Sequence, residues 1–354
     1  MGAGSSPPRS RSAGGRSAWR LYNTPDSQFA GEPHFRHAAF AMTPLRTIAT
    51  IMLFGLGLLA WCYWTAVSDP VVRVAELELL PTAGETNELR VLLISDIHVA
   101  GPDMSPSRLR QIVRQANKLR PDLILIAGDL VSDKRVSTRT YSLTDAVAPL
   151  RELKGRLGVF AVLGNHDHWR NAAAAGLALK DAGIHMLDNS AARAGPLVVG
   201  GLDDPFTRHD DLQATLQAMR ELGGVPILLS HSPDPFPAVP TDVELMVAGH
   251  THCGQIRLPL IGALSYMSEH GDRYACGLIR ESGKVLVVSA GLGTSLLPLR
   301  LGAVPDMWLL HLKVRRPAAT KSRASAVGRK QPFAQRLNQP ETRPISSSNR
   351  QLGS

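Results

Sequence analysis

The chain has 354 residues, 44 % hydrophobic and 19 % charged, so it is long enough for one large core or two modest ones. The formal charge of +9 is concentrated at the ends, with six Arg before residue 47 and ten Lys or Arg after residue 312, and the middle of the chain is mildly acidic. This distribution argues against a basic nucleic-acid groove on the folded part, and no nucleic-acid partner is expected.

The two ends have the composition of solvated, unstructured chain. Residues 1–46 are rich in Ser, Gly, Pro, Ala and Arg, and they predict a disordered basic leader. Met42 is an alternative start, which would make most of this leader an over-extended gene model. Residues 315–354 are rich in Ser, Arg, Gln and Pro and predict a disordered basic tail.

A long apolar stretch follows the leader. Residues 47–67 are 21 positions without a charge, enough to span a bilayer as a helix rising about 1.5 Å per residue. Trp61, Tyr63 and Trp64 lie near one end, where amphipathic aromatic residues are typical. A buried core helix is rarely apolar on all sides for this length, the stretch lacks a small-residue signal cleavage site, and bulky Trp61 disfavours a lipoprotein signal ending at Cys62. The stretch therefore predicts one retained membrane anchor.

The charges that flank this stretch bear on its orientation. Arg36 and Arg46 precede it, whereas only Arg73 follows it closely. The positive-inside rule then places the N-terminus in the cytoplasm and the main domain on the extracytoplasmic side.

The remainder of the chain predicts one compact domain. Residues 68–88 are expected to form a linker or a lead-in strand, and the domain is expected to cover residues 89–314. The predicted strands are 89–94, 123–127, 159–163, 184–187, 197–199, 227–229, 245–248, 285–288 and 307–312. One predicted helix begins after Ser105, and three others cover about 144–153, 171–181 and 210–222. This alternation predicts an α/β fold with largely buried central strands.

Polar residues follow five of the predicted strands. They are Asp96 and His98, then Asp129, then Asn165, His166 and Asp167, then His231, and finally His250 and His252. Any one of them alone fits a turn former, a helix cap or a hydrogen-bonded structural His. Ligands of α/β sheets bind outside the carboxyl ends of the strands, so the five groups together are expected to converge on one site.

These blocks carry a family resemblance. Asp96-Ile97-His98, Gly128-Asp129, Gly164-Asn165-His166-Asp167, Ser230-His231 and Gly249-His250-Thr251-His252 stand in the order of the calcineurin-like metallophosphoesterase superfamily. The resemblance covers about residues 89–312 and implies a layered β-sandwich flanked by helices. The anchor and the run 254–259 resemble a membrane-attached bacterial subgroup, some members of which hydrolyse the pyrophosphate of UDP-2,3-diacylglucosamine in lipid A biosynthesis. The resemblance thus implies a place in the bacterial inner membrane.

The resemblance also implies roles for individual residues. Asp96, His98 and His252 would hold one divalent metal ion, Asn165, His231 and His250 the other, and Asp129 would bridge them. Carboxylate and imidazole ligands without thiolate suit Mn, Fe, Zn or Co. A metal-bridged hydroxide would then attack the phosphorus in line. His166 would act as general acid at the leaving oxygen, and Asp167 would orient His166.

Three further features are open to more than one interpretation. The three Cys, at positions 62, 253 and 276, are odd in number and imply no disulfide framework. Cys253 is expected to be a small residue that fills a glycine-sized space beside the site. Residues 291–295 predict a turn at the site mouth, because they lack the Lys of a phosphate-binding P-loop. Arg300 is a candidate contact for substrate phosphate, with a structural ion pair as the alternative.

The leading hypothesis is a membrane-anchored dinuclear-metal phosphohydrolase that cleaves a phosphomonoester, phosphodiester or pyrophosphate bond of a small-molecule or lipid-linked substrate. The anchor beside the domain favours a lipid-linked or envelope substrate. UDP-2,3-diacylglucosamine is the most specific candidate substrate, but it is cytosolic, whereas the flanking charges place the domain outside. A cell-envelope phosphodiesterase or phosphatase of other specificity avoids this conflict. A non-catalytic anchored binding module is the alternative from another class, and it would be expected to have lost ligands.

Overall fold

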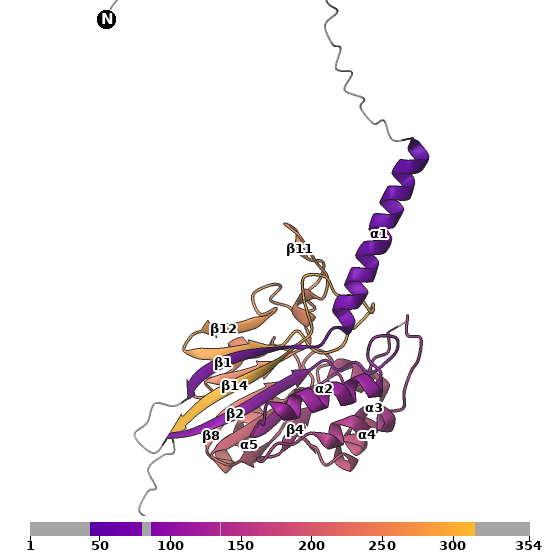
Figure 1. The fold of residues 1–354 in the computed structure, drawn as a ribbon. Coiled ribbons are helices and arrows are strands. Elements are labelled where there is room, and N and C mark those ends of the chain that lie inside the picture. The colour runs from indigo at the N-terminus through magenta and orange to yellow at the C-terminus, as the bar shows by residue number, and fades with distance from the viewer. Residues whose placement is uncertain (1–42, 80–85, 135, 316–354) are drawn as a thin grey trace, which may run out of the picture. The chain divides into compact units, whose positions relative to one another are not determined.

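The structure is a computed structural model that describes residues 43–79, 86–134 and 136–315. The predicted leader up to residue 42 and the predicted tail from residue 316 lie outside the described residues. Two six-stranded sheets pack face to face, and helices cover their outer faces (Figure 1). The expected α/β sandwich flanked by helices is confirmed.

The first sheet has the strand order β1-β14-β2-β3-β4-β5. The bounds are β1 Val71–Leu79, β14 Asp306–Arg315, β2 Thr86–Ser95, β3 Leu123–Ala127, β4 Val159–Val162 and β5 His185–Met186. Strands β2 to β5 run parallel, and β14 joins β2 antiparallel. The parallel strands therefore present their carboxyl ends at one edge of the sheet.

The segment predicted as a linker supplies the edge strand of this sheet. β1 pairs in parallel with β14 over its whole length, from Val71 opposite Asp306 to Leu79 opposite Val314. Its side chains alternate, because Leu77 and Leu79 are buried while Glu78 between them is exposed. Of the two predictions for residues 68–88, β1 agrees with the lead-in strand and not with the linker, and the domain begins before residue 89.

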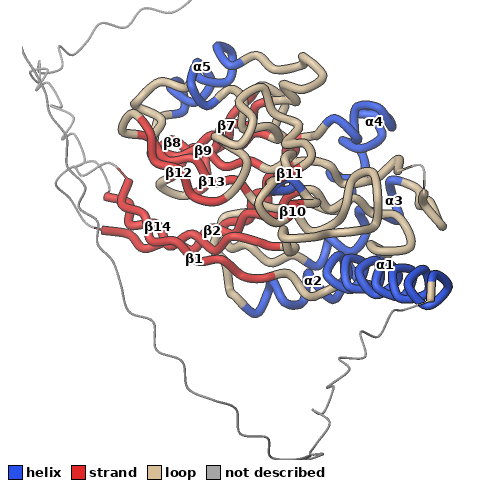
Figure 2. Tube along the Cα trace, turned by 90° about the horizontal axis from the view of Figure 1, so that it is seen from above, coloured by secondary structure: helices blue, strands red, loops and turns tan. Residues whose placement is uncertain are grey.

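The second sheet has the strand order β12-β13-β9-β8-β7-β6. The bounds are β12 Gly277–Glu281, β13 Lys284–Val288, β9 Leu245–Ala248, β8 Val225–Ser230, β7 Leu197–Leu202 and β6 Ser190–Ala194. The four inner strands run parallel, and β12 and β6 are antiparallel edges. A separate hairpin, β10 Arg257–Leu258 and β11 Gly262–Ala263, lies near the same strand ends (Figure 2).

Successive side chains of a strand point to opposite faces of its sheet, so each strand contributes to two layers of the core. In β2, Val91 and Leu93 point into the space between the sheets, whereas Leu92 and Ile94 point toward the helices. The helices over the first sheet are α2 Pro106–Lys118, α3 Leu143–Val147 and α4 Asn165–Asp181, and α5 Leu212–Leu222 packs on the second sheet. Both faces of each sheet are therefore covered, as parallel sheets require.

Two helices differ from the prediction in their bounds. The helix expected over 144–153 is shorter, because Pro149 follows α3 and the chain continues as a 3-10 turn, Ala148–Glu152. Helix α4 begins at Asn165 instead of about Asn171, and Asn171 itself is non-helical. The earlier start places Asn165, His166 and Asp167 in the first turn of a helix.

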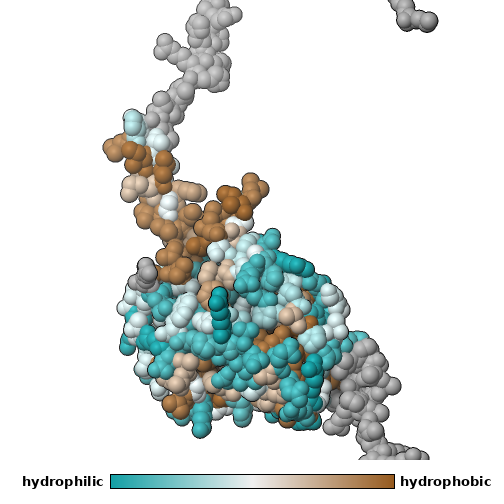
Figure 3. Space-filling view, turned by 180° about the vertical axis from the view of Figure 1, so that it is seen from behind, coloured by the Kyte–Doolittle hydropathy of each residue, from teal (hydrophilic) through white to brown (hydrophobic). Residues whose placement is uncertain are grey.

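Helix α1, Pro44–Val67, contains the predicted membrane stretch and is long and apolar enough to cross a membrane (Figure 3). Residues up to Leu53 form a unit apart from the main unit, which runs from Phe54, and each is taken by itself. Within the main unit, the last turns of α1 are packed, because Cys62, Thr65 and Ala66 are buried. The Tyr63 hydroxyl also donates to the carbonyl of Pro102 at 3.3 Å.

Candidate metal centre

The seven predicted ligand side chains lie together at the carboxyl ends of the strands. They are Asp96, His98, Asp129, Asn165, His231, His250 and His252, and all are buried. The pairing of the parallel strands explains why these side chains meet, because Ser95 at the end of β2 pairs with Ala127 at the end of β3. The polar residue that follows each strand therefore emerges at the same level.

The local backbone aims these side chains away from the strand axes. Asp96, His98, Asp129, His250 and His252 all have left-handed φ angles, between 47° and 70°. Each such residue costs about 1–2 kcal/mol relative to ordinary backbone. Left-handed residues other than Gly cluster at functional sites, where the surrounding structure over-determines them.

Glycines in the motifs allow the loops to approach the carboxylates. A Cβ at Gly249 would stand 2.3 Å from Asp96 Oδ2, and a Cβ at Gly164 would stand 2.3 Å from Asp129 Oδ1. Real side chains do not tolerate such distances, so Gly is required at both positions. The backbone N–H of His250 donates to Asp96 Oδ1 at 3.0 Å through this close approach.

One group of ligand atoms lies around His252. Its Nε2 is 3.0 Å from His98 Nε2 and 3.5 Å from Asp96 Oδ1. The Asp129 Oδ2 atom is 3.3 Å from His98 Nε2 and also 3.3 Å from His231 Nε2. One carboxylate oxygen of Asp129 thus stands between two clusters of imidazoles.

The second group lies around His231. Its Nε2 is 3.1 Å from Asn165 Oδ1 and 3.1 Å from His250 Nδ1. The other ring nitrogen, Nδ1, lies 2.8 Å from the carbonyl of Ala127, which requires an N–H at that position. In the neutral ring, the Nε2 lone pair therefore faces the lone pairs of Asp129 and Asn165.

Lone pairs that face one another at about 3 Å in a buried site need a cation among them. This arrangement fits a bound metal ion at His231, and the parallel arrangement at His252 fits a second. Carboxylates and imidazoles at this spacing are able to hold metals.

The electrostatics of the site keep three of its imidazoles neutral beside an ionised carboxylate, whereas the carboxylate of Asp129 raises the pKa of His231 against the effect of burial. Burial lowers the pKa of His98 and His252 well below the ordinary value and lowers the pKa of His250 to about 3. Burial raises the pKa of Asp129, but the rings of His231, His166 and His98 more than offset this and hold it well below its usual range. The imidazoles of His98, His250 and His252 are therefore unprotonated at neutral pH, as metal ligands must be.

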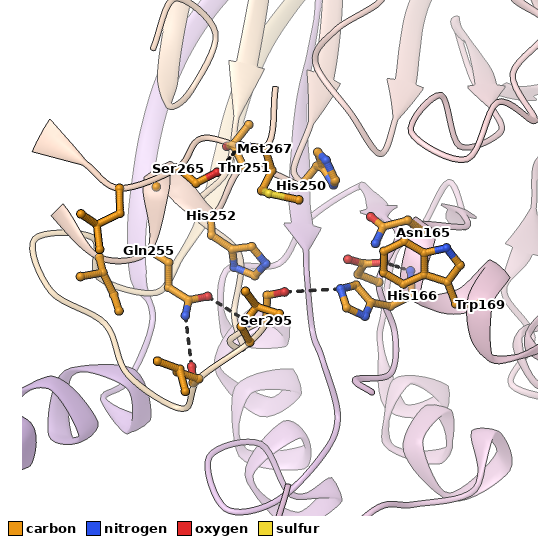
Figure 4. A pocket seen from close by; sticks show the side chains of 16 residues that line it. Asn165, His166, Trp169, His250, Thr251, His252, Gln255, Ser265, Met267 and Ser295 are labelled. Carbon is orange, nitrogen blue, oxygen red and sulfur yellow. Dashed lines mark hydrogen bonds between the residues drawn. The ribbon is translucent and has the colours of Figure 1, made fainter. Parts of the chain in front are cut away.

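His166 lies beside this cluster and reaches into the pocket. Its backbone N–H donates to Asp129 Oδ1 at 2.9 Å, which ties the first turn of α4 to the bridging carboxylate. Its Nε2 is 3.4 Å from Ser295 Oγ on the facing loop (Figure 4). Its Nδ1 is hydrogen-bonded to the carboxylate of Asp133.

The prediction that Asp167 orients His166 is wrong. Asp167 Oδ1 accepts the backbone N–H of Leu130 at 2.9 Å, and Oδ2 accepts the backbone N–H of Gly164 at 3.1 Å. Burial raises the pKa of Asp167 to about 7. Asp167 fastens the loop after β3 to α4, and the partner of the His166 ring is Asp133, in the loop after the Gly128-Asp129 motif.

Asp133→Asn is expected to lower kcat about tenfold without changing KM or metal content, because a half-exposed hydrogen bond to a charged group is worth about that factor. Steady-state kinetics and metal analysis check this. In a His166→Ala background the same change is expected to cost nothing, because the ring that Asp133 orients is then absent. An undiminished loss in that background would mean that Asp133 acts elsewhere.

Arg300, the candidate contact for substrate phosphate, is fully buried and does not line the cavity, which favours the structural alternative. Its side chain donates to the carbonyls of Ala290, Gly291 and Gly293 at 2.6–3.2 Å. It also lies 3.4 Å from His252 Nδ1. Arg300 therefore holds the loop after β13 against the metal-ligand loop, and it is a structural residue.

Arg300→Met is expected to lower the free energy of unfolding by about 3 kcal/mol or more, because the substitution leaves several buried carbonyls without a donor. Thermal unfolding of the purified protein measures this. Arg280→Met, at an exposed position of β12, is the matched control and should leave the melting temperature unchanged. A stable Arg300→Met protein with a raised KM would restore the substrate-binding role.

The interpretation of Cys253 as a space-filling residue is incomplete. Cys253 forms a disulfide with Cys276, with Cα atoms 4.7 Å apart. Cys253 directly follows His252, so the bond ties the metal-ligand loop to the segment that precedes β12. Cys62 is free and buried.

A cavity of about 320 Å³ opens over these groups (Figure 4). Its floor consists of Asp129, Asn165, His166, His250 and His252. Its walls are mostly apolar and include Trp169, Ile256, Leu264, Met267, Leu296 and Leu297. Of residues 291–295, predicted as a turn near the mouth, only Ser295 lines the cavity, and the other four are buried, with Gly291 and Gly293 against Asp96 and His98.

Known proteins have similar sequences. Residues 89–254 match the family described as calcineurin-like phosphoesterase. The chain is 32 % identical over 294 residues to a Danio rerio protein named transmembrane protein with metallophosphoesterase domain, covering 78 % of this chain and 63 % of that protein. It is 30 % identical over 232 residues to the uncharacterized metallophosphoesterase YkuE of Bacillus subtilis, covering 63 % of this chain and 79 % of that protein.

The chain thus spans somewhat less than two thirds of the zebrafish relative. Among solved structures, the protein TT1561 of Thermus thermophilus aligns with a TM-score of 0.37 at 15 % identity, covering 58 % of this chain and 91 % of that chain. The Bacillus protein is matched over 79 % of its length at 30 % identity, and residues 89–254 match the family model, so the chain belongs to the calcineurin-like phosphoesterases.

Proposed function

We propose that the protein is a membrane-anchored phosphohydrolase with two divalent metal ions. Asp96, His98 and His252 would hold one ion, and Asn165, His231 and His250 the other, with Asp129 between them. The observation that carries this assignment is Asp129 Oδ2, which is equally distant, at 3.3 Å, from a ring nitrogen of each set. Nitrogen and oxygen ligands without thiolate suit Mn, Fe, Zn or Co.

Bound metals of this kind supply an activated water and offset negative charge on the phosphoryl oxygens. His166 then gives the leaving oxygen its proton from Nε2, the ring atom that faces Ser295 in the cavity. Asp133 holds the opposite ring nitrogen as a donor, so the ring keeps its orientation while it loses and regains the proton. The apolar walls exclude bulk water, which strengthens these polar interactions.

The anchor and its side of the membrane belong to the same proposal. Helix α1 would be retained in a bacterial inner membrane, with the domain on the extracytoplasmic side. Arg36 and Arg46, which precede the uncharged stretch 47–67, support this orientation, and so does the disulfide between Cys253 and Cys276, because disulfides persist in oxidising compartments. The substrate would then be an envelope phosphoester, cleaved by a phosphodiesterase or phosphatase activity.

UDP-2,3-diacylglucosamine is the second candidate substrate, and the apolar walls of the cavity are the observation that favours an acylated molecule. This candidate requires a cytoplasmic domain. Alkaline phosphatase fused after residue 354 is expected to be active, which would remove UDP-2,3-diacylglucosamine and lipid A biosynthesis from consideration. An inactive phosphatase fusion together with a fluorescent cytoplasmic reporter would favour it instead.

Chelation tests the proposed reaction. We expect the metal-free chain to hydrolyse bis-p-nitrophenyl phosphate and p-nitrophenyl phosphate about a thousandfold more slowly than the loaded chain, since metal ions contribute several kcal/mol of transition-state stabilisation. Added Mn, Zn, Fe or Co should restore the rate. A wild-type chain that binds no metal and hydrolyses neither compound would support a non-catalytic binding module.

A further inference from the structure

The walls of the cavity continue into an exposed apolar surface. The hairpin of β10 and β11 turns at Leu260, which is fully exposed, and Ile261, which is 74 % exposed. Leu264, after the hairpin, is 68 % exposed, and Leu296, on the facing loop, is 72 % exposed. We call Leu260, Ile261, Leu264 and Leu296 the apolar rim. Large apolar side chains gathered on loop tips mark an interaction surface.

The apolar rim is connected to the end of α1 through a short strap. The backbone N–H of Arg300 donates to the carbonyl of Cys62 in α1 at 3.0 Å. The next residue, Leu301, accepts the backbone N–H of Arg257 in β10 at 2.8 Å and donates to Gln255 at 3.0 Å. Two adjacent residues therefore join the hairpin to the helix, and the hairpin projects on the same side of the domain as α1 from Phe54 onward (Figures 1 and 3).

Aromatic residues indicate the level of the membrane surface at this place. Trp61 and Trp64 are more than half exposed, and their rings lie 5.2 Å apart. Tryptophans at the end of a membrane helix sit at the headgroup level. Cys62, the attachment point of the strap, lies between them in sequence, and Leu296 is only four residues before Arg300, a reach of at most about 14 Å. With α1 in a bilayer, as proposed above, the strap holds Leu296 of the apolar rim close to the headgroup level.

The same residues lead to the metal ligands. Leu264 and Leu296 belong both to the apolar rim and to the wall of the cavity, and Ile256, Met267 and Leu297 continue that wall toward His252 and His166. No Lys or Arg side chain lines this cavity among the described residues. An apolar path thus runs from the membrane surface to the site of phosphate chemistry.

We propose that the site acts on the phosphoester of a membrane lipid, which enters from the bilayer with its hydrocarbon chain along the wall from Leu296 to Met267. This inference rests on the proposed hydrolase function. Water adds its oxygen to phosphorus, the bond from phosphorus to the leaving oxygen breaks, and that oxygen takes a proton from His166. The proton released by the attacking water restores the ring. The hairpin tip, Leu260 and Ile261, lies in the bilayer and keeps the cavity mouth against it.

The test uses the full-length chain in phosphatidylglycerol–phosphatidylethanolamine vesicles and two phosphodiesters with the same leaving group, hexadecyl and ethyl p-nitrophenyl phosphate. The hexadecyl chain holds its ester in the bilayer, where the proposed entrance lies, whereas the ethyl ester stays in water, so the rate at equal total concentration is expected to be about a hundredfold or more higher for the hexadecyl ester, because each methylene moved from water to hydrocarbon is worth about fourfold. Equal rates on both esters would overturn the lipid proposal and leave the hydrolase function standing. Hydrolysis of neither ester by the metal-loaded chain would overturn both.

Variants separate membrane contact from catalysis. The double change Leu260→Asp and Ile261→Asp is expected to lower the rate on the vesicle-embedded hexadecyl ester about tenfold or more, because charged residues are expelled from the bilayer, while bis-p-nitrophenyl phosphate hydrolysis stays within about twofold. Leu177→Asp, at an exposed leucine of α4, is the matched control and should change neither rate. Equal losses on both substrates would overturn the membrane contact.

A fluorescent label reports the contact directly. A bimane attached after Ile261→Cys is expected to be quenched by lipids brominated in the acyl chain, whereas the same label after Leu177→Cys should not be quenched. Absence of quenching at position 261 would overturn the proposal. Cross-linking between two labelled hairpins in that case would indicate that a second copy of the chain covers the apolar rim.

Discussion

Asp129→Ala is expected to lower phosphoester hydrolysis by about a thousandfold or more, further than the loss of any single terminal ligand, since both metal ions are affected and together supply several kcal/mol. The physical reason is the position of one oxygen. Oδ2 of Asp129 lies 3.3 Å from both His98 and His231, and Oδ1 accepts the N–H of His166. Metal content by mass spectrometry and kcat/KM on bis-p-nitrophenyl phosphate measure the effect.

His252→Ala is the comparison for Asp129→Ala. It removes a ligand from one set only, so the protein should keep about one ion per chain and a larger share of its activity. The assignment would fail if Asp129→Ala kept two ions, or if the His252 variant were the less active of the two while still folded.

His166→Ala is expected to lower kcat by about a hundredfold to ten-thousandfold while metal content stays at the wild-type level, because a positioned general acid contributes that much. One ring nitrogen of His166 lies within 4.8 Å of ligand atoms of His98 and Asp129, so the metal content of the variant decides between a ligand and a general acid. Its Nδ1 is engaged by Asp133 and its Nε2 faces Ser295 across the cavity. Steady-state kinetics with metal analysis of the same samples check both parts.

The leaving group tests the role of His166 more sharply. A phosphodiester with an alkyl leaving group needs a proton on the departing oxygen, whereas p-nitrophenolate leaves without one. The loss in His166→Ala should therefore be large for the alkyl ester and small for the p-nitrophenyl ester. A variant that has lost metal, or that loses the same factor on both esters, would show that His166 is a ligand.

The convergence of the ligands was predictable because it follows from local rules. Each of Asp96, Asp129, His231 and His250 comes just after an apolar run, and parallel strands end at a common edge. The order of the five motifs supplied the family resemblance, and the resemblance supplied the assignment of ligands to each metal ion. Fold class and ligand cluster therefore depend on features that a single sequence carries within a few residues.

The contacts that escaped prediction depend on the tertiary fold. Asp133 and Asp167 are both carboxylates close to a motif, and only the packing of the loop after β3 on α4 decides which one meets the His166 ring. Arg300 follows a Pro- and Leu-rich loop that resembles a surface segment, yet it is fully buried under backbone carbonyls. The Cys253–Cys276 bond joins residues 23 positions apart and has no local signal.

The edge strand β1 differs from these contacts, because the alternating pattern typical of a strand is visible in its sequence. Residues 71–79 alternate between outward and inward side chains, but one short run cannot show which strand it joins. Its partner β14 lies more than two hundred residues away in the sequence. The partner of β1 is therefore set by the assembly of the whole sheet and not by residues close to it in sequence.

The most direct test of the account is the number of metal ions per chain, titrated against hydrolysis of bis-p-nitrophenyl phosphate by the full-length protein. The account predicts two ions per chain, with activity that rises as the second site fills and disappears in Asp129→Ala. Full activity in a chain that holds no metal, or no hydrolysis in a chain that holds two ions, would contradict it.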